Sequence, residues 1–215
     1  MGRPLTWRRA DLAGSPTQAA LALLGATVRS DSAEGCVAVR ITETEGYGGD
    51  DDPGSHAFRG QTARNATMFG PPGFAYVYFT YGMHWCLNVV CGESGLPSAV
   101  LIRAGEVVEG LDLARERRPG ARDRDLARGP ARLTRALGVT GLDDGVDLLS
   151  PDSRLRLVTR VQIAEGSVRW GPRVGVAGEG ASTPWRVHLL DEPTVSPYRP
   201  ATPRKRRASA TPRTR

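Results

Sequence analysis

The chain has 215 residues, of which 40% are hydrophobic and 24% are charged. That composition is typical of one globular domain and excludes a wholly disordered protein. A membrane-spanning protein is not expected either, because no apolar run approaches the about 18 residues that a spanning helix needs. The first nine residues contain arginine but no apolar stretch follows them, so no secretory signal is expected.

The positive charge lies at one end of the chain. The formal net charge is +6, but residues 198–215 hold seven basic residues and no acidic one. The rest of the chain carries 22 basic and 23 acidic residues and is nearly neutral. We therefore expect a globular domain over residues 1–197 and a disordered basic tail over residues 198–215. Such a tail either binds phosphates weakly or keeps the protein in solution.

The three cysteines, Cys36, Cys86 and Cys91, form no CxxC pair. An odd number of cysteines is a poor disulfide framework, so a reducing cytoplasm is the expected setting. The chain also lacks a glycine-rich phosphate loop of the Walker or dinucleotide type, so no nucleotide cofactor is expected.

The first predicted elements are a short helix and a strand. Ser15 and Gln18 have the spacing of a capping box, and Pro16 occupies the first helical position of a helix that ends near Leu24. In the strand that follows, alternate positions form an inward face that is apolar at first and acidic at its end. This face holds Val37, Val39, Ile41, Glu43 and Glu45.

A second block of strands is predicted between Phe74 and Gly105. Two alternating segments flank a tight turn at Thr80–Met83, which predicts a hairpin. Another strand is predicted at Ser98–Arg103. Phe74, Tyr76 and Tyr78 share one face of the first segment, and His84, Cys86, Asn88 and Val90 share one face of the second.

The remaining segments are predicted to form helices and then strands. Residues 106–137 have a helical pattern with a break near Pro119. Alternation returns at Leu155–Val158, Arg173–Val176 and Trp185–Leu190. Runs of strands with helices grouped between them predict an α+β fold with a largely antiparallel sheet.

Glu45 is the strongest candidate for acid–base chemistry. A carboxylate at the end of an inward strand face can act as a general base for water. The alternative is a structural acid paired with Arg40 or Arg103, because a buried carboxylate is costly without a partner. For a single glutamate taken alone, the structural interpretation is the stronger of the two.

The tyrosines carry two interpretations each. Tyr76 and Tyr78 can stack on a planar ligand, although strand aromatics more often pack in the core. Tyr81 lies at the predicted hairpin tip, where an aromatic ring is hard to bury. It suits a wedge between base pairs, or it folds back over the hairpin, and the residues leave both possibilities open.

A metal site is not predicted. His56 follows Asp50, Asp51 and Asp52, but the spacing matches no standard ligand motif. Three aspartates in a glycine-rich loop are usually solvated.

A set of short segments, each weak alone, is specific in its order and spacing. The segments are Ile41–Tyr47, Gln61–Asn65, Met68–Phe69, Tyr76–Tyr78, Tyr81–Met83, Asn88, Leu101–Ala104, Glu109–Gly110, Gly129–Leu133, Arg173–Val176 and Pro184–Arg186. Together they resemble the alkyladenine (3-methyladenine) DNA glycosylase family, in the vertebrate-type form also found in bacteria. The resemblance covers roughly residues 5–197.

The resemblance implies a fold, an activity and a partner. The fold would be a single compact domain around a curved, largely antiparallel β-sheet with flanking helices. The activity would be base-excision repair, in which an alkylated or deaminated purine is flipped out of duplex DNA and its N-glycosidic bond is hydrolysed. The resemblance further implies a bacterial, cytoplasmic monomer that associates with the nucleoid when bound to DNA and uses no metal and no cofactor.

The resemblance also implies roles for individual residues. Glu45 would be the general base with Arg103 beside it, and Tyr81 would be the intercalating wedge. Gly46 and His84 depart from the alanine and the aromatic residue usual in the family. The base pocket would hold Tyr47, His56, Tyr78 and Asn88, and further DNA contacts would come from Thr62, Met68 and Met83.

Two alternatives belong to other classes of protein. One is a nucleic-acid-binding module that flips or stacks bases without cleaving, which release of free base would exclude. The other is a metal-dependent hydrolase that uses Asp50, Asp52 and His56, which chelator-resistant activity would exclude.

Overall fold

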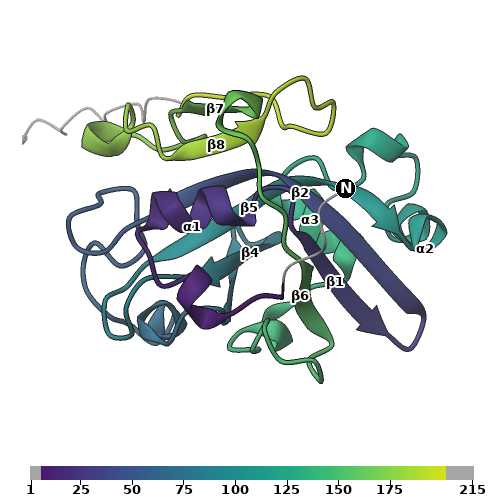
Figure 1. The fold of residues 1–215 in the computed structure, drawn as a ribbon, viewed down its shortest axis with the longest axis horizontal. Coiled ribbons are helices and arrows are strands. Elements are labelled where there is room, and N and C mark those ends of the chain that lie inside the picture. The colour runs from purple at the N-terminus through teal and green to yellow at the C-terminus, as the bar shows by residue number, and fades with distance from the viewer. Residues whose placement is uncertain (1–5, 202–215) are drawn as a thin grey trace, which may run out of the picture.

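The computed structural model describes residues 6–201, and its main feature is one curled antiparallel sheet (Figure 1). The sheet follows the order β3-β4-β5-β2-β1-β6, with β8 on a second stretch of β2 and β7 on β8. Three α-helices flank it within the described range, which confirms the predicted α+β class. The strands are β1 (Thr27–Ser32), β2 (Gly35–Tyr47), β3 (Ala75–Thr80), β4 (His84–Val90), β5 (Ala99–Glu109), β6 (Leu155–Thr159), β7 (Val168–Gly171) and β8 (Arg186–Leu189). The helices are α1 (Pro16–Leu23), α2 (Leu111–Arg117) and α3 (Pro130–Leu137).

The long strand β2 organises the sheet. One of its edges pairs with β5, while the other pairs first with β1 and then, from Glu43 to Glu45, with β8. Register shifts on both sides of Glu43 interrupt the strict alternation of the strand. Val37, Val39 and Ile41 therefore lie in the main hydrophobic core, whereas the two glutamates meet arginines. Both carboxylates are buried, as predicted.

Helix α1 confirms the predicted capping box. Ser15 Oγ accepts a hydrogen bond from the backbone N–H of Gln18, and the Gln18 side chain accepts one from the N–H of Ser15. The helix packs on β2, where Thr44 donates to the Ala20 carbonyl at 3.0 Å. A side chain at Gly46 would lie 3.0 Å from the Pro16 carbonyl oxygen. The close approach of α1 thus explains glycine at this position.

The predicted hairpin is formed by β3 and β4. Three residues, Tyr81, Gly82 and Met83, connect the strands, and the Met83 N–H donates to the Thr80 carbonyl at 3.1 Å. Tyr81 and Gly82, the central residues of this turn, have φ values of 51° and 65°, the left-handed region that the favoured hairpin turns use. The register places Tyr78 opposite Cys86 and Tyr76 opposite Asn88. Opposite residues of an antiparallel pair lie on the same face of a sheet, so the tyrosines and the Asn88 row share one surface.

Two predicted elements are wrong. Residues 106–109 belong to β5 rather than to a helix, because the pairing with β2 continues as far as Glu109. Arg173–Val176 is a loop rather than a strand, because β5 and β8 already occupy the edges of β2 beside it. The strands β1 and β7 were not predicted. In β1, Val28 is the single large apolar residue, so the alternation gives little signal.

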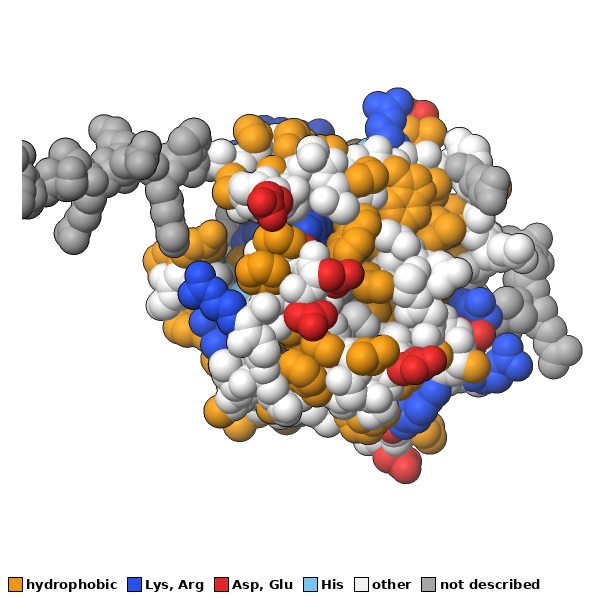
Figure 2. Space-filling model, turned by 90° about the vertical axis from the view of Figure 1, so that its left-hand side faces the viewer, with side chains coloured by type: hydrophobic (Ala, Val, Ile, Leu, Met, Phe, Trp, Pro, Cys, Tyr) orange, Lys and Arg blue, Asp and Glu red, His pale blue; other side chains and the backbone are white. Residues whose placement is uncertain are grey.

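The described part of the chain ends at Ala201, so most of the predicted tail lies outside the described residues. Contacts continue beyond the predicted boundary at Pro197, since Gly175 N–H donates to the Arg199 carbonyl at 3.1 Å. Acidic and basic side chains are interspersed on the face drawn in Figure 2, as expected for a nearly neutral domain. Among residues 6–201, no helix has the length and apolar character needed to cross a membrane.

Candidate active site

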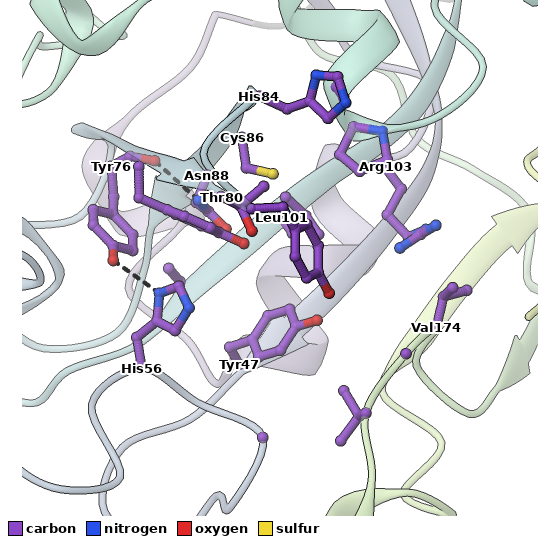
Figure 3. Close-up of a pocket in the computed structure, with 18 of the residues that line it drawn as sticks. Tyr47, His56, Tyr76, Thr80, His84, Cys86, Asn88, Leu101, Arg103 and Val174 are labelled. Atoms are coloured by element: carbon purple, nitrogen blue, oxygen red, sulfur yellow. Dashed lines mark hydrogen bonds between the residues drawn. The ribbon is translucent and has the colours of Figure 1, made fainter. Parts of the chain in front are cut away.

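A pocket of about 390 Å³ opens over strands β3, β4 and β5 (Figure 3). Its volume lies in the range of about 300–1,000 Å³ that is typical of small-molecule sites. Tyr78, Asn88 and Arg103 reach it from the sheet, while His56 and Val174 reach it from two loops. The first residues of α3 complete its lining.

The walls of the pocket are aromatic. The rings of Tyr76 and Tyr78 lie 5.4 Å apart, and His56 stands edge-on to Tyr78 at 4.4 Å. The hydroxyl of Tyr76 and Nδ1 of His56 are hydrogen-bonded at 3.0 Å (Figure 3), and Tyr47 lines the same pocket. The structure therefore brings together Tyr47, His56 and Tyr78. The pocket also contains Tyr76, which the resemblance did not assign to it. The alternation of the strand, which places Tyr76 on the same face as Tyr78, indicates this position.

The pocket is neutral where His56 and Tyr76 meet. Burial, aided by the nearby Arg64 guanidinium, lowers the pKa of His56 below its usual 6.5. Burial raises the pKa of Tyr76 to about 12. Both rings are uncharged at neutral pH, so they offer hydrogen bonds and π faces without repelling a cationic ligand.

Glu45 lies directly beneath the pocket and is completely buried. Its carboxylate accepts hydrogen bonds from the Tyr47 hydroxyl at 2.9 Å, from the Val174 N–H at 2.7 Å and from Arg103 at 3.4 Å. All three donors line the pocket, so the carboxylate is one layer of residues away from the cavity. Of the two predicted structural partners, Arg103 is therefore found, whereas Arg40 pairs with other acids.

Burial sets the basicity of Glu45. It raises the pKa of this carboxyl above its ordinary 4.5, against the opposing effects of the Arg103 charge and the Val174 N–H. A raised pKa makes the carboxylate a stronger base than an exposed glutamate, and the adjacent guanidinium stabilises its ionised form. The environment is suited to a group that must be ionised and still accept a proton.

Arg103 is held in place by a second buried carboxylate, Glu43. The Arg103 Nε donates to Glu43 at 3.1 Å. Glu43 also accepts hydrogen bonds from the Arg186 side chain and from the Ser196 N–H. Two glutamates thus face two arginines in the interior, and their charges balance. This arrangement fixes the Arg103 guanidinium at the pocket wall (Figure 3).

An unexpected ion pair joins the two loops of the pocket. Arg173 and Asp52 are both buried and form two hydrogen bonds, of 2.6 and 2.7 Å. The Arg173 guanidinium lies 4.7 Å from the ring centre of Tyr47 and donates to the Gly46 carbonyl. The interpretation of Asp52 as a solvated residue is therefore wrong. No local pattern distinguishes it from Asp50 and Asp51, which are exposed.

The hairpin tip projects from the molecule. The side chain of Tyr81 is 87% exposed and that of Met83 is 68% exposed. Tyr81 also lines the mouth of the pocket. Of the two possibilities that the sequence left open, the structure shows the projecting tyrosine and not the folded-back one.

The other predicted residues occupy different places. Asn88 lines the pocket, and its amide is fixed by donation to the Tyr76 carbonyl at 2.9 Å. Met68 is buried in the pocket wall, so it does not lie on the outer surface of the molecule, where a DNA contact was expected. Thr62 is exposed and caps a turn through two hydrogen bonds to Asn65. The structure does not bring Thr62 into the pocket.

The metal-dependent alternative gains no support from the geometry. Among the described residues, no group of three or more histidine, cysteine, aspartate or glutamate side chains has a metal-binding arrangement. Asp52 is occupied by Arg173 instead of converging with Asp50 and His56.

Comparisons with known proteins decide the family. The family model described as methylpurine-DNA glycosylase matches residues 10–193. The chain belongs to the methylpurine-DNA glycosylase family. A relative from Streptomyces avermitilis is 54% identical over 86% of this chain and 88% of its own length. Another from Leifsonia xyli subsp. xyli is 56% identical over 86% of this chain and 89% of its own. Both are named as candidate 3-methyladenine DNA glycosylases.

Proposed function

We propose that this chain is a base-excision repair glycosylase that removes alkylated purines from duplex DNA and leaves an abasic site. Family membership supports the reaction. The observation that carries the proposal is a buried carboxylate, Glu45, whose hydrogen-bond partners form one side of an aromatic pocket. Such a site can hold one planar base and act on the bond that joins it to the sugar.

The aromatic walls account for the choice of damaged bases. An alkylated purine carries a positive charge, and electron-rich rings attract a cation more strongly than a neutral base. Tyr47, Tyr76 and Tyr78 provide such rings, and stacking contributes about 1–3 kcal/mol per base. Asn88 has a fixed amide at the pocket wall, where it selects against the exocyclic amino group of normal guanine.

Glu45 and Arg103 serve the chemical step. Loss of the base leaves an oxocarbenium-like sugar, as in glycoside hydrolysis. Glu45 stabilises this positive charge and accepts the proton of the attacking water, while Arg103 orients the carboxylate and keeps it ionised. A cationic leaving purine needs no protonation, so a single carboxylate is enough.

The hairpin provides the flipping step. Extruding a base from the stack costs a few kcal/mol, and the vacated space must be filled to prevent the base from returning. Tyr81 is exposed at the tip and borders the pocket, so it fills the stack while the base enters the cavity. Met83 extends the contact on the same tip, and Thr62 contacts the backbone nearby.

The enzyme is monofunctional and acts as a monomer in the bacterial cytoplasm, on the nucleoid. Strand cleavage through a Schiff base needs an amine nucleophile, and the chain's single lysine, Lys205, lies in the basic tail. The catalytic domain extends beyond the expected boundary at Pro197, because Gly175 of the pocket bonds to Arg199, and the basic residues after Ala201 add salt-dependent affinity for DNA.

A base-release assay tests the proposal. Duplexes that carry 3-methyladenine, 7-methylguanine, hypoxanthine or ethenoadenine are incubated with the enzyme, with and without a chelator, and free base is measured. Release from the alkylated duplexes in both conditions is the expected result. Binding without release would identify a binding module, and loss of release with the chelator would identify a metal-dependent hydrolase.

A further inference from the structure

A second groove lies beside the base pocket, across the hairpin tip. It has a volume of about 750 Å³ and is lined by β4, α3 and the end of α2. The two cavities share His84 and Ala131, but Tyr81 lines only the base pocket and Met83 lines only the groove. The hairpin tip therefore separates them.

The groove gathers more basic than acidic side chains. Four arginines line it, Arg117, Arg118, Arg132 and Arg135, together with one acidic residue, Glu34. Arg117 pairs with Glu34 at 3.0 Å. Within the part of the chain that the structure describes, no carboxylate forms an ion pair with the other three. In contrast, the neighbouring Arg115 on α2 is paired with Asp112 and Asp123.

The surroundings of Arg118 compensate its positive charge only in part, since the attraction of Asp125 is outweighed by burial and by neighbouring arginines. Its Nε atom is buried without a hydrogen-bond partner among the described residues. Burial and the like charges of Arg132 and Arg135 lower its pKa. Like charges held together raise the free energy of a site, and a polyanion with regularly spaced charges relieves this. The chemistry fits a phosphodiester backbone.

The position of the wedge indicates which strand occupies the groove, and this step rests on the proposed function. A wedge takes the place of the flipped base in the stack, so the flipped base lies on one side of it and the former pairing partner on the other. The base pocket lies on the Tyr81 side of the tip and the groove on the Met83 side. We propose that the groove binds backbone phosphates of the strand opposite the damaged base.

Neutralising either the arginines or the phosphates tests the proposal. Arg132 and Arg135 are exposed on α3, so R132Q and R135Q keep the fold, which a melting curve verifies. R169Q is the matched control, because Arg169 is exposed on β7 and lines neither cavity. The probe is a duplex that carries a tetrahydrofuran abasic analogue. Neutral methylphosphonate linkages are placed either in the analogue strand or in the opposite strand.

Neutral linkages in the opposite strand are expected to weaken binding by wild type and R169Q but not by the R132Q/R135Q double variant. Linkages in the analogue strand are expected to weaken all proteins alike. The slope of log K against log salt should fall by about 0.9 for each phosphate that the protein no longer neutralises. The proposal would be overturned if the double variant bound the unmodified duplex as tightly as wild type. It would also be overturned if the double variant lost its sensitivity to neutral linkages in the analogue strand only.

Base release at saturating DNA separates this inference from the proposed function. The double variant is expected to release base at the wild-type rate once it is bound, because the groove arginines do not contact Glu45. If wild type shows the expected sensitivity to neutral linkages in the opposite strand but releases no base, the proposed reaction is contradicted. The inference that the groove binds phosphates of that strand would still stand.

Discussion

Glu43 and Glu45 are two residues apart on β2 and equally buried, yet their surroundings give them different tasks. The three hydrogen-bond partners of Glu45 all line the pocket. Glu43 instead faces Arg186 and Ser196 as well as Arg103, so it lies within the structural network. Substituting each in turn separates catalysis from stability.

Glu45→Gln keeps the size of the side chain but removes its charge and its basicity. Excision in single-turnover assays is expected to fall by roughly 10²–10⁴-fold, the usual effect of losing a general base. Binding to lesion DNA should persist, because the pocket walls and the wedge are unchanged. Near-normal excision by this variant would exclude Glu45 as the base.

Glu43→Gln is the matched control. It leaves Arg103 and Arg186 buried with one carboxylate fewer, and breaking a buried pair costs about 3–5 kcal/mol. We expect a clear fall in melting temperature and a milder loss of excision per folded molecule than in Glu45→Gln. A larger catalytic loss from Glu43 than from Glu45 would reverse the assignment.

The pH dependence of excision follows from the same burial. As the proposed base, Glu45 must be ionised, and burial raises its pKa above 4.5. The single-turnover rate should therefore rise with pH through a value above that of an exposed glutamate. Rates measured between about pH 4 and pH 8 check this. The acidic limb should vanish in Glu45→Gln, and an unchanged limb there would assign it to another group.

Tyr81→Ser removes the proposed wedge and leaves Glu45 and the inner walls of the pocket unchanged. Base flipping should weaken, and the loss should be smaller where the lesion is mispaired, because extrusion costs less there. Excision from matched and mismatched duplexes is compared at saturating enzyme. An equal loss in both contexts would show that Tyr81 has only a structural role.

At the scale of elements, two loops form one side of the pocket and depend on one ion pair. Arg173 links the loop of Asp52 to the loop of Val174 and rests on the Tyr47 ring. In the loop of Val174, the Val174 N–H donates a hydrogen bond to the Glu45 carboxylate. The pair therefore determines where the pocket wall lies relative to the carboxylate.

Asp52→Asn is expected to lower stability by about 3–5 kcal/mol, the usual effect of breaking a buried pair. Burial acts to raise the pKa of Asp52, but hydrogen bonds from Arg173 and Gly48 outweigh it and lower the pKa below 3.8. The stabilisation is thus complete above the ordinary pKa and is lost as the pH falls through the folded value. As the pH falls, the free energy of unfolding should therefore decrease more for wild type than for the variant. If it decreased equally in both proteins, the ionisation of Asp52 would not contribute to stability.

The elements that could be predicted from the sequence are those defined by short patterns of neighbouring residues. The capping box of α1, the β3–β4 hairpin and its tyrosine face follow from residues close together in the sequence. The α+β class followed from runs of strands with helices grouped between them. The alternation of β2 made Glu45 a candidate, but only a resemblance favoured the catalytic interpretation over the structural one, and the role of this residue stays a prediction. The clamp between Asp52 and Arg173 joins residues far apart in the chain, so no spacing rule indicates it. The extension of β5 depended on pairing with β2, which overrode a helical pattern.

At the scale of the whole molecule, the charge divides into a neutral body and a basic end. Ending the chain after Ala201 removes six basic residues and leaves 23 basic and 23 acidic ones. It also preserves the Arg199 carbonyl, which holds the Gly175 backbone at the pocket. DNA binding should weaken and become less salt-dependent, with little change in the rate at saturating DNA. An unchanged salt slope would show that the tail does not contact DNA.

The left-handed backbone of Tyr81 has a consequence for engineering this enzyme. A residue with a side chain costs about 1–2 kcal/mol in that conformation, whereas asparagine followed by glycine is the pair that such turns favour. Thermostabilisation guided by turn statistics would therefore select asparagine at position 81. The substituted protein would be more stable but, on the proposed role of Tyr81, would no longer open the duplex, because the side chain that strains the turn is the one that the proposed flipping step needs.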